Sequence, residues 1–147
     1  MAAMCHKRII IPAICVLLAA MMVVLGCAEY AIMYLDKGNR HLAQGQFDEA
    51  IAAYTRVIEL DPESVIVYGN RGEAYYSIGE YDKAIADCTK AIEMAPEFWL
   101  AYYHRGLAYE SKGEYEKAAS DYEKVIEMAT DPELVEGAHQ ALEGIGE

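Results

Sequence analysis

Apolar, aromatic and small residues recur along most of this chain at intervals of 34 positions, with polar residues between them. The recurrent positions include two series of glycines, one of tyrosines and one of alanines, namely Gly38, Gly72 and Gly106, Gly45, Gly79 and Gly113, Tyr34, Tyr68 and Tyr102, and Ala50, Ala84 and Ala118. A fixed period in this range is typical of repeat architectures, in which each period forms one structural unit. The pattern therefore divides the chain into three repeats, residues 31–64, 65–98 and 99–132.

Each repeat has the pattern of two helices joined by a turn. In the second repeat, Tyr68, Gly72 and Tyr76 share one face of a helix, because a spacing of four residues matches the helical period. Gly79 follows and predicts a helix end, since glycine adopts the left-handed conformation of a C-cap without steric cost. Apolar residues at helical spacing return between residues 81 and 92. One such pair cannot bury its apolar face alone, so neighbouring repeats must stack.

A further helix is predicted after the third repeat, in residues 133–147. Its apolar positions follow helical spacing: Leu134, Ala138, Ala141 and Ile145. Glutamates and a glutamine occupy the other faces of this segment. Because a stack of repeats needs a terminal unit with a polar outer face, we expect residues 133–147 to form a C-terminal capping helix.

The order of tyrosines, glycines, alanines and prolines in residues 31–132 resembles the tetratricopeptide repeat. The resemblance implies an all-α fold, a right-handed superhelical solenoid of three antiparallel helix pairs followed by the capping helix. It also implies a concave groove lined by the first helix of each pair. Since members of this family are interaction scaffolds, the resemblance implies a protein-binding module with no cofactor, and not an enzyme.

The resemblance also implies which residues line the groove, most of them apolar or aromatic. They are Leu35, Asn39, Ile66, Asn70, Glu73, Tyr76, Leu100, Tyr103, His104 and Leu107. Exposed apolar grooves usually mark interaction sites, so we expect the apolar members to project into solvent, without a role in the core, and to bind an extended or helical peptide segment. Tyr76 and Tyr103 are the expected anchors, because aromatic residues often dominate binding energy.

One subclass of the family binds the C-terminal carboxylate of a peptide with two lysines, an arginine and two asparagines. Asn39 and Asn70 match the asparagine positions, whereas the basic positions hold Leu35, Leu100 and His104. The sequence therefore predicts that carboxylate binding of this kind is lost. The two amides either bond the backbone of an extended peptide or are ordinary amides of a helix surface, and the sequence leaves both interpretations open.

Acidic residues outnumber basic residues in the repeats. Residues 27–147 hold 24 Asp and Glu against 10 Lys and Arg, a formal charge of −14. Such an excess repels phosphate groups and argues against nucleic acid as a partner. Asp36, Glu73 and Glu110 are expected at the groove, where they should favour a segment carrying Lys or Arg, and protonation of His104 would weaken that preference.

The N-terminal stretch has a different composition from the repeats. Lys7 and Arg8 precede residues 9–26, a run of 18 residues without a charged side chain. A positive segment, an apolar segment and then small residues are the plan of a signal peptide. A helix of this length is also close to the span of a bilayer core, so residues 1–26 are predicted to be either a signal peptide or an N-terminal membrane-anchor helix.

The sequence VVLGC, residues 23–27, resembles the lipobox of bacterial lipoproteins. In that family the cysteine receives a diacylglycerol group and the signal is cut before it. The resemblance thus implies that a lipidated Cys27 is the mature N-terminus, anchored in the bacterial cell envelope and facing outside the cytoplasm. The alternative is an uncleaved single-pass anchor, with a concave face that mediates self-association of the chain into a homo-oligomer.

Few residues outside the groove have a pattern that indicates chemistry. Arg71 and Arg105 precede Asp87 and Asp121 by 16 residues, an offset that brings side chains together in a helix hairpin, so we expect partly exposed structural ion pairs. Cys88 stands where the other repeats have tyrosine, which predicts a small core residue instead of a reactive thiol. The sequence contains no metal-ligand spacing and no pairing of a nucleophile with a base.

Overall fold

The computed structural model describes residues 28–145, and all regular structure in this range is α-helical. The helices are the first helix, described over residues 28–43, α2 (Phe47–Leu60), α3 (Val65–Ser77), α4 (Tyr81–Met94), α5 (Trp99–Ser111), α6 (Tyr115–Met128) and α7 (Pro132–Ile145). The predicted all-α fold is confirmed. The first helix is already formed at residue 28, three residues before the predicted start of the first repeat.

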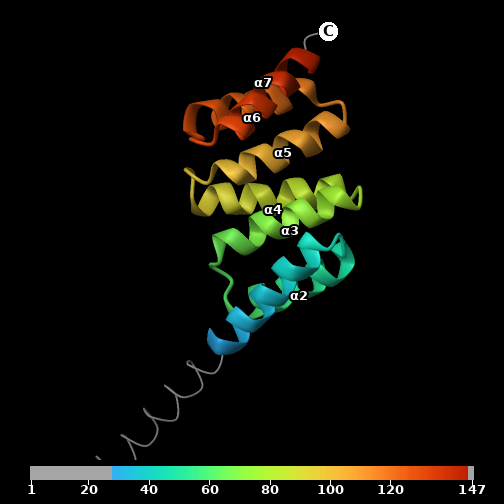
Figure 1. Cartoon of the computed structure of the whole chain (residues 1–147), viewed down its shortest axis with the longest axis vertical. Coiled ribbons are helices and arrows are strands. Elements are labelled where there is room, and N and C mark those ends of the chain that lie inside the picture. The colour runs from blue at the N-terminus through green and yellow to red at the C-terminus, as the bar shows by residue number, and fades with distance from the viewer. Residues whose placement is uncertain (1–27, 146–147) are drawn as a thin grey trace, which may run out of the picture.

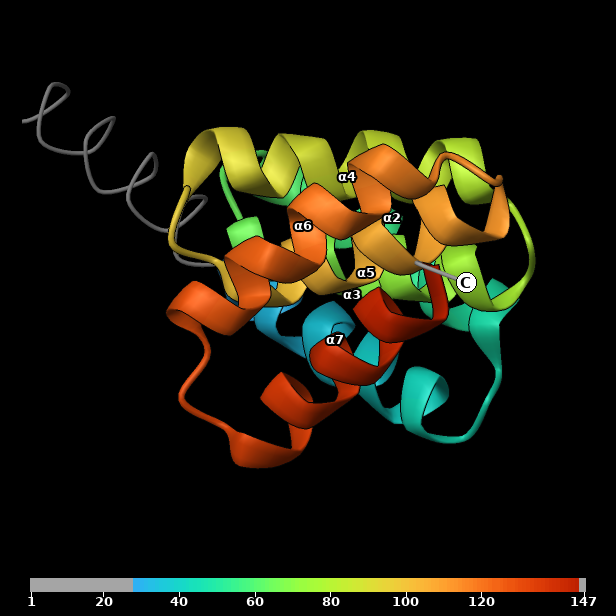
Figure 2. The ribbon, with the colours of Figure 1, turned by 90° about the horizontal axis from the view of Figure 1, so that it is seen from above.

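The helices form three antiparallel pairs, and the pairs stack into a solenoid (Figure 1). The first helix pairs with α2, α3 pairs with α4, and α5 pairs with α6. The first helix of each later pair also packs on the preceding pair, since α3 contacts α2 and α5 contacts both α4 and α3. The view along the stack shows α4 and α6 on one side of α3 and α5, and α7 on the other side (Figure 2).

Glycines end the first helix of every pair. Gly45, Gly79 and Gly113 have φ angles of 70°, 80° and 74°, and no other described residue has a positive φ. The left-handed conformation is easily accessible only to glycine, which explains why these three positions recur at the repeat period. The C-cap predicted at Gly79 is confirmed.

A second series of glycines lets the two helices of each pair approach closely. A Cβ atom at Gly38 would lie 2.5 Å from the Tyr54 ring, and one at Gly106 would lie 2.8 Å from the Tyr122 ring. In the middle repeat the corresponding partner of Gly72 is the sulfur of Cys88. All three partners are fully buried, so Cys88 is the core residue that its position predicted.

Each of the two predicted ion pairs is present, and each also joins two repeats. Arg71 donates from Nε and Nη2 to the two carboxylate oxygens of Asp87, at 2.6 and 2.9 Å, and from Nη1 to the hydroxyl of Thr55 in the preceding repeat, at 3.0 Å. Arg105 repeats this arrangement with Asp121 and Thr89, at 2.8, 2.7 and 3.1 Å. The aspartates are buried and the arginines are partly exposed, so the pairs are shielded from solvent on the aspartate side. The neighbouring repeat covers them.

The capping helix α7 begins at Pro132, one residue before the predicted segment, and packs against α6 through the buried Ala138. Between residues 28 and 145, no helix has both the length and the apolar character needed to cross a membrane. The predicted signal peptide or anchor, residues 1–26, and the predicted lipid attachment site, Cys27, lie outside the described residues.

Candidate functional site

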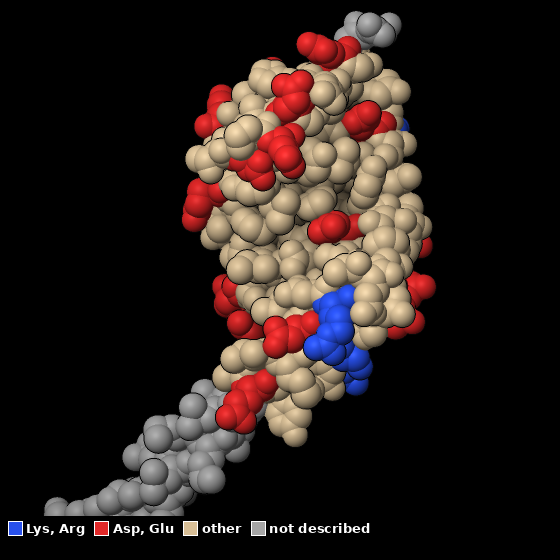
Figure 3. Space-filling model, viewed as in Figure 1, with Lys and Arg blue, Asp and Glu red and all other residues tan. Residues whose placement is uncertain are grey.

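The first helices of the three pairs form one face of the solenoid, here called the concave face, which Figure 3 shows. Acidic side chains are spread over this face, whereas Lys and Arg atoms gather at the end formed by the first helix and α2 (Figure 3). The only basic residues of α3 and α5 are Arg71 and Arg105. Because both are bound to buried aspartates, the middle of the face has no free basic side chain.

The predicted apolar groove residues fall into two groups. Ile66 is 56% exposed, and Tyr76 and Leu100 are partly exposed, as expected for residues that project from the face. The remaining three, Leu35, Tyr103 and Leu107, fall in the same range of partial exposure as Tyr76 and Leu100, but they pack on core clusters. The expectation that they have no role in the core is wrong.

Close packing of neighbouring helices explains why Tyr103 takes part in the core. The Tyr103 ring lies 6.2 Å from the Tyr122 ring, centroid to centroid, and 5.7 Å from the imidazole of His104. Its hydroxyl approaches the backbone of α7 near Gly137. Tyr103 therefore offers only part of its surface to a ligand.

The two groove asparagines bond each other. Asn70 donates from Nδ2 to Oδ1 of Asn39 at 3.1 Å, and the hydroxyl of Tyr54 donates to the same oxygen at 2.8 Å. Burial raises the pKa of Tyr54 to about 12, so this hydroxyl stays protonated and remains a donor at neutral pH. The carbonyl of Asn39 is thus already occupied, while Asn70 keeps its own carbonyl for a ligand.

Glu73 and His104 lie together in the middle of the face. Oε2 of Glu73 is 3.5 Å from Nε2 of His104, and the imidazole is almost completely buried. Burial lowers the pKa of His104 to about 4 and raises the pKa of Glu73 above its ordinary value. His104 is therefore neutral at neutral pH, so the expectation that it tunes charge preference by protonation does not apply there.

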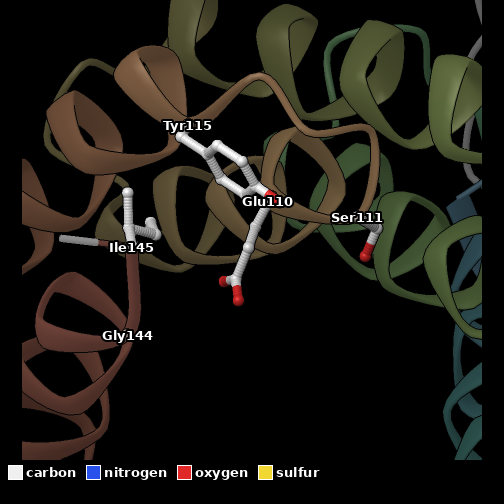
Figure 4. Close-up of a pocket in the computed structure, with 5 residues that line it drawn as sticks. All are labelled: Glu110, Ser111, Tyr115, Gly144 and Ile145. Atoms are coloured by element: carbon white, nitrogen blue, oxygen red, sulfur yellow. The ribbon is translucent and has the colours of Figure 1, made fainter. Parts of the chain in front are cut away.

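A cavity of about 330 Å³ lies between the C-terminal ends of α5 and α7. It is lined by Glu110, Ser111, Tyr115, Gly144 and Ile145 (Figure 4). Glu110 extends toward the opening, and one of its carboxylate oxygens accepts a hydrogen bond of 2.6 Å from the Tyr122 hydroxyl. Burial, together with this bond, raises the pKa of Tyr122 well above its ordinary value. The cavity therefore presents the carboxylate of Glu110 in a lining that is mostly polar.

Sequence reasoning missed the part that the second helices play at this face. Tyr54 and Tyr122 belong to α2 and α6, yet their hydroxyls bond groove residues of the first helices. The sequence does contain a signal for this arrangement. Each tyrosine stands opposite a glycine that recurs at the repeat period, Tyr54 opposite Gly38 and Tyr122 opposite Gly106. The missing side chain of the glycine leaves room for the ring between the helices.

The thiol of the middle repeat is not activated for chemistry. Cys88 is fully buried, and burial raises the pKa of its thiol to about 12, which leaves it protonated at neutral pH. Within residues 28–145, no three His, Cys, Asp or Glu residues are placed to hold a metal ion. What the face offers a ligand is apolar surface, amides and carboxylates.

Comparison with known proteins identifies related domains. Two family models described as tetratricopeptide repeat match residues 35–97 and 99–130. No curated protein sequence matches the chain.

Several solved structures are similar over most of the chain. The first TPR of Spaghetti (RPAP3) bound to the HSP90 peptide SRMEEVD is 29% identical with a TM-score of 0.73, covering 81% of this chain and 95% of that one. The second TPR domain of human RPAP3 in complex with the HSP70 peptide SGPTIEEVD is 30% identical with a TM-score of 0.74, covering 82% and 98%. The TPR2B–pHsp70 complex of yeast Sti1 is 26% identical with a TM-score of 0.75, covering 80% and 97%.

Proposed function

Because the chain belongs to the tetratricopeptide repeat family, we propose that it is a protein-interaction module whose concave face binds a peptide segment of a partner protein. Its right-handed solenoid of helix pairs is the scaffold on which related domains bind peptides. The observation that carries the proposal is the apolar surface on this face of the exposed Ile66 and of the partly exposed Tyr76 and Leu100. Burial of such surface against a ligand is favourable.

The module differs from its peptide-binding relatives in the chemistry of the groove. The peptides in the RPAP3 complexes end in the acidic sequence EEVD. In this chain Leu35, Leu100 and His104 stand at the positions that hold basic residues in the carboxylate-binding subclass. A peptide with a free, acidic C-terminus would meet no cation at these positions. The segment bound by this chain is therefore not an acidic C-terminus of the EEVD kind.

We also propose that the module is tethered to a bacterial membrane and faces outside the cytoplasm, as a scaffold or assembly factor for an envelope complex. The support is the apolar run of residues 9–26 and the lipobox-like order of residues 23–27. Since helix is already present at residue 28, a lipid on Cys27 would hold the first repeat at the membrane surface.

Site-specific photo-crosslinking of the full-length chain in bacterial cells tests the binding face. A benzophenone amino acid at Ile66 or Leu100 should form adducts with a partner protein. The matched control carries the same group at Ala86, an exposed position on α4 away from the concave face.

The mass of the adducts decides between the two candidate functions. Partner adducts from positions 66 and 100, and none from position 86, support the peptide-binding module. Equal adducts from all three positions would overturn it. Adducts that contain only a second copy of the chain would replace it with self-association through the concave face.

A further inference from the structure

The concave face contains one polar arrangement in two copies, and only the first copy is complete. In the first, Oδ1 of Asn39 accepts hydrogen bonds from Asn70 and from the hydroxyl of Tyr54. One repeat period later, the corresponding positions hold Glu73, His104 and Cys88. The short, fully buried side chain of Cys88 cannot supply a hydroxyl to the face as Tyr54 does. The second copy thus lacks the donor that completes the first.

His104 is left with unpaired polar atoms beside the carboxylate of Glu73. Their 3.5 Å separation is too long for a good hydrogen bond, and neither ring nitrogen of His104 has a partner among the described residues. The Glu73 side chain is 37% exposed and reaches solvent, whereas that of His104 is 10% exposed. Because buried polar atoms are nearly always paired, the two unpaired ring nitrogens of His104, beside the partly exposed carboxylate of Glu73, indicate a place for a group that the chain itself does not provide.

A group that pairs the Glu73 carboxylate must be a hydrogen-bond donor, and a positively charged donor fits it best. An ionised carboxylate is purely an acceptor. Arg71 and Arg105 are the basic residues nearest in sequence to Glu73 and His104. Each already donates two hydrogen bonds to an aspartate, so neither pairs with Glu73. Burial keeps His104 neutral at neutral pH, so the imidazole does not compensate the charge of Glu73.

We propose that Glu73, beside His104, is the point on the concave face that receives an arginine or lysine side chain of the bound peptide. The inference rests on the proposed function and names the chemical class of its partner. The guanidinium or ammonium group donates charge-assisted hydrogen bonds to the carboxylate, which are stronger than neutral ones. Glu110, at the mouth of the cavity between α5 and α7, adds a second carboxylate toward the far end of the groove.

Selection from a library of random short peptides tests this inference on the full-length chain in lipid nanodiscs. The wild-type chain is compared with Glu73→Gln, which keeps the shape of the side chain and removes its charge. The matched control is Glu93→Gln, on the exposed surface of α4. The best wild-type peptide is then synthesised with each arginine replaced by citrulline, the neutral isostere, and with each lysine replaced by norleucine.

We expect Lys or Arg to be enriched at a fixed position in peptides selected on the wild-type chain and on Glu93→Gln, and not on Glu73→Gln. Neutralising that residue should weaken binding to the wild-type chain at least about tenfold, and to Glu73→Gln by less than about twofold. Peptides that bind without such enrichment would overturn the inference and leave the proposed function intact. Failure to select any peptide would overturn the proposed function as well. Thermal unfolding of each variant verifies that all three chains are folded.

Discussion

Cys88 packs so closely against Gly72 that a Cβ atom at position 72 would lie 2.5 Å from the cysteine sulfur. The same Cβ atom would lie 3.4 Å from the carbonyl oxygen of Ala84, an ordinary van der Waals contact, so the cysteine sulfur is the group that blocks it. Overpacking a filled core typically costs about 1–3 kcal/mol. We therefore expect Gly72→Ala to lower the free energy of unfolding by this amount and Gly72→Leu by more, as measured by urea denaturation.

The matched control for this prediction is Gly144→Ala. Gly144 lies in α7, and among the described residues no atom beyond its chain neighbours and its own helix backbone stands within 4 Å of a Cβ built there. Alanine is the better helix former, so Gly144→Ala should leave stability unchanged or raise it slightly. If Gly72→Ala and Gly144→Ala have the same midpoint of unfolding, the close approach of α3 and α4 is not as described.

Cys88→Tyr should be tolerated, although it inserts a large ring into the core. Tyr54 and Tyr122 occupy the corresponding position in the other repeats, and each lies against a glycine as Cys88 lies against Gly72. By the same geometry a hydroxyl at position 88 would reach toward Glu73 and His104. We expect the free energy of unfolding to change by less than about 1 kcal/mol, against about 1–3 kcal/mol for ordinary overpacking.

Cys88→Phe separates the two effects of this change. It adds the same ring without the hydroxyl, so it should be less stable than Cys88→Tyr in the same denaturation experiment. A loss of several kcal/mol in both variants would mean that the middle repeat has closed around the cysteine and no longer accommodates a ring.

The repeat period predicted the parts of the fold that local spacing controls. The turn at Gly79 and the pairing of Arg71 with Asp87 both depend on residues within a single helix hairpin, and both are present. The period did not reveal how neighbouring repeats share side chains. Tyr103 takes part in the core because α6 and α7 pack beside it, and the buried His104 lies beside Glu73 of the preceding repeat. Such contacts depend on the docking of separate units, which spacing alone does not specify.

Arg71→Met should strongly destabilise the solenoid. Removal of the guanidinium leaves Asp87, which is 8% exposed, without its partner and also frees Thr55 of the preceding repeat. Breaking a buried ion pair from one side costs about 3–5 kcal/mol, well above the roughly 1 kcal/mol of an exposed pair. Thermal and urea unfolding of the full-length chain measure the loss.

Two further variants locate this effect. Thr55→Val keeps the Arg71–Asp87 pair and removes only the link between repeats, so we expect a smaller loss of about 1 kcal/mol. Arg56→Ala removes the exposed pair with Glu59 and should leave stability unchanged. An Arg71→Met variant as stable as Arg56→Ala would show that the Arg71–Asp87 pair does not stabilise the solenoid.

His104 should make the chain less stable as the pH falls below neutrality. Burial lowers its pKa from 6.5 to about 4 in the folded chain, so between these values the unfolded chain binds a proton that the folded chain does not. The stability that depends on neutral His104 is complete above pH 6.5 and is lost as the pH falls toward 4, by on the order of 3 kcal/mol. The adjacent Glu73 acts in the opposite direction, because burial raises its pKa in the folded state.

Comparison with His104→Asn checks this dependence. Asparagine is the residue at the corresponding position of the preceding repeat, Asn70, and it does not titrate. The free energy of unfolding, measured by urea denaturation between pH 7 and pH 5, should fall more steeply in the wild-type chain than in His104→Asn. Parallel curves would show that His104 is protonated in the folded chain at its ordinary pKa.

The mature chain should begin at a lipid-modified Cys27. The order of residues 23–27 fits the lipobox, and the first helix is already formed at residue 28, so a lipid at this position would bring the first repeat directly to the membrane surface. Mass spectrometry of protein extracted from bacterial membranes should find residues 1–26 absent and acyl mass on Cys27. Cys27→Ala should abolish both changes, whereas Cys88→Ala, at a fully buried cysteine, should alter neither. A membrane-bound form that retains residues 1–26 without acyl mass would instead identify that segment as an uncleaved anchor.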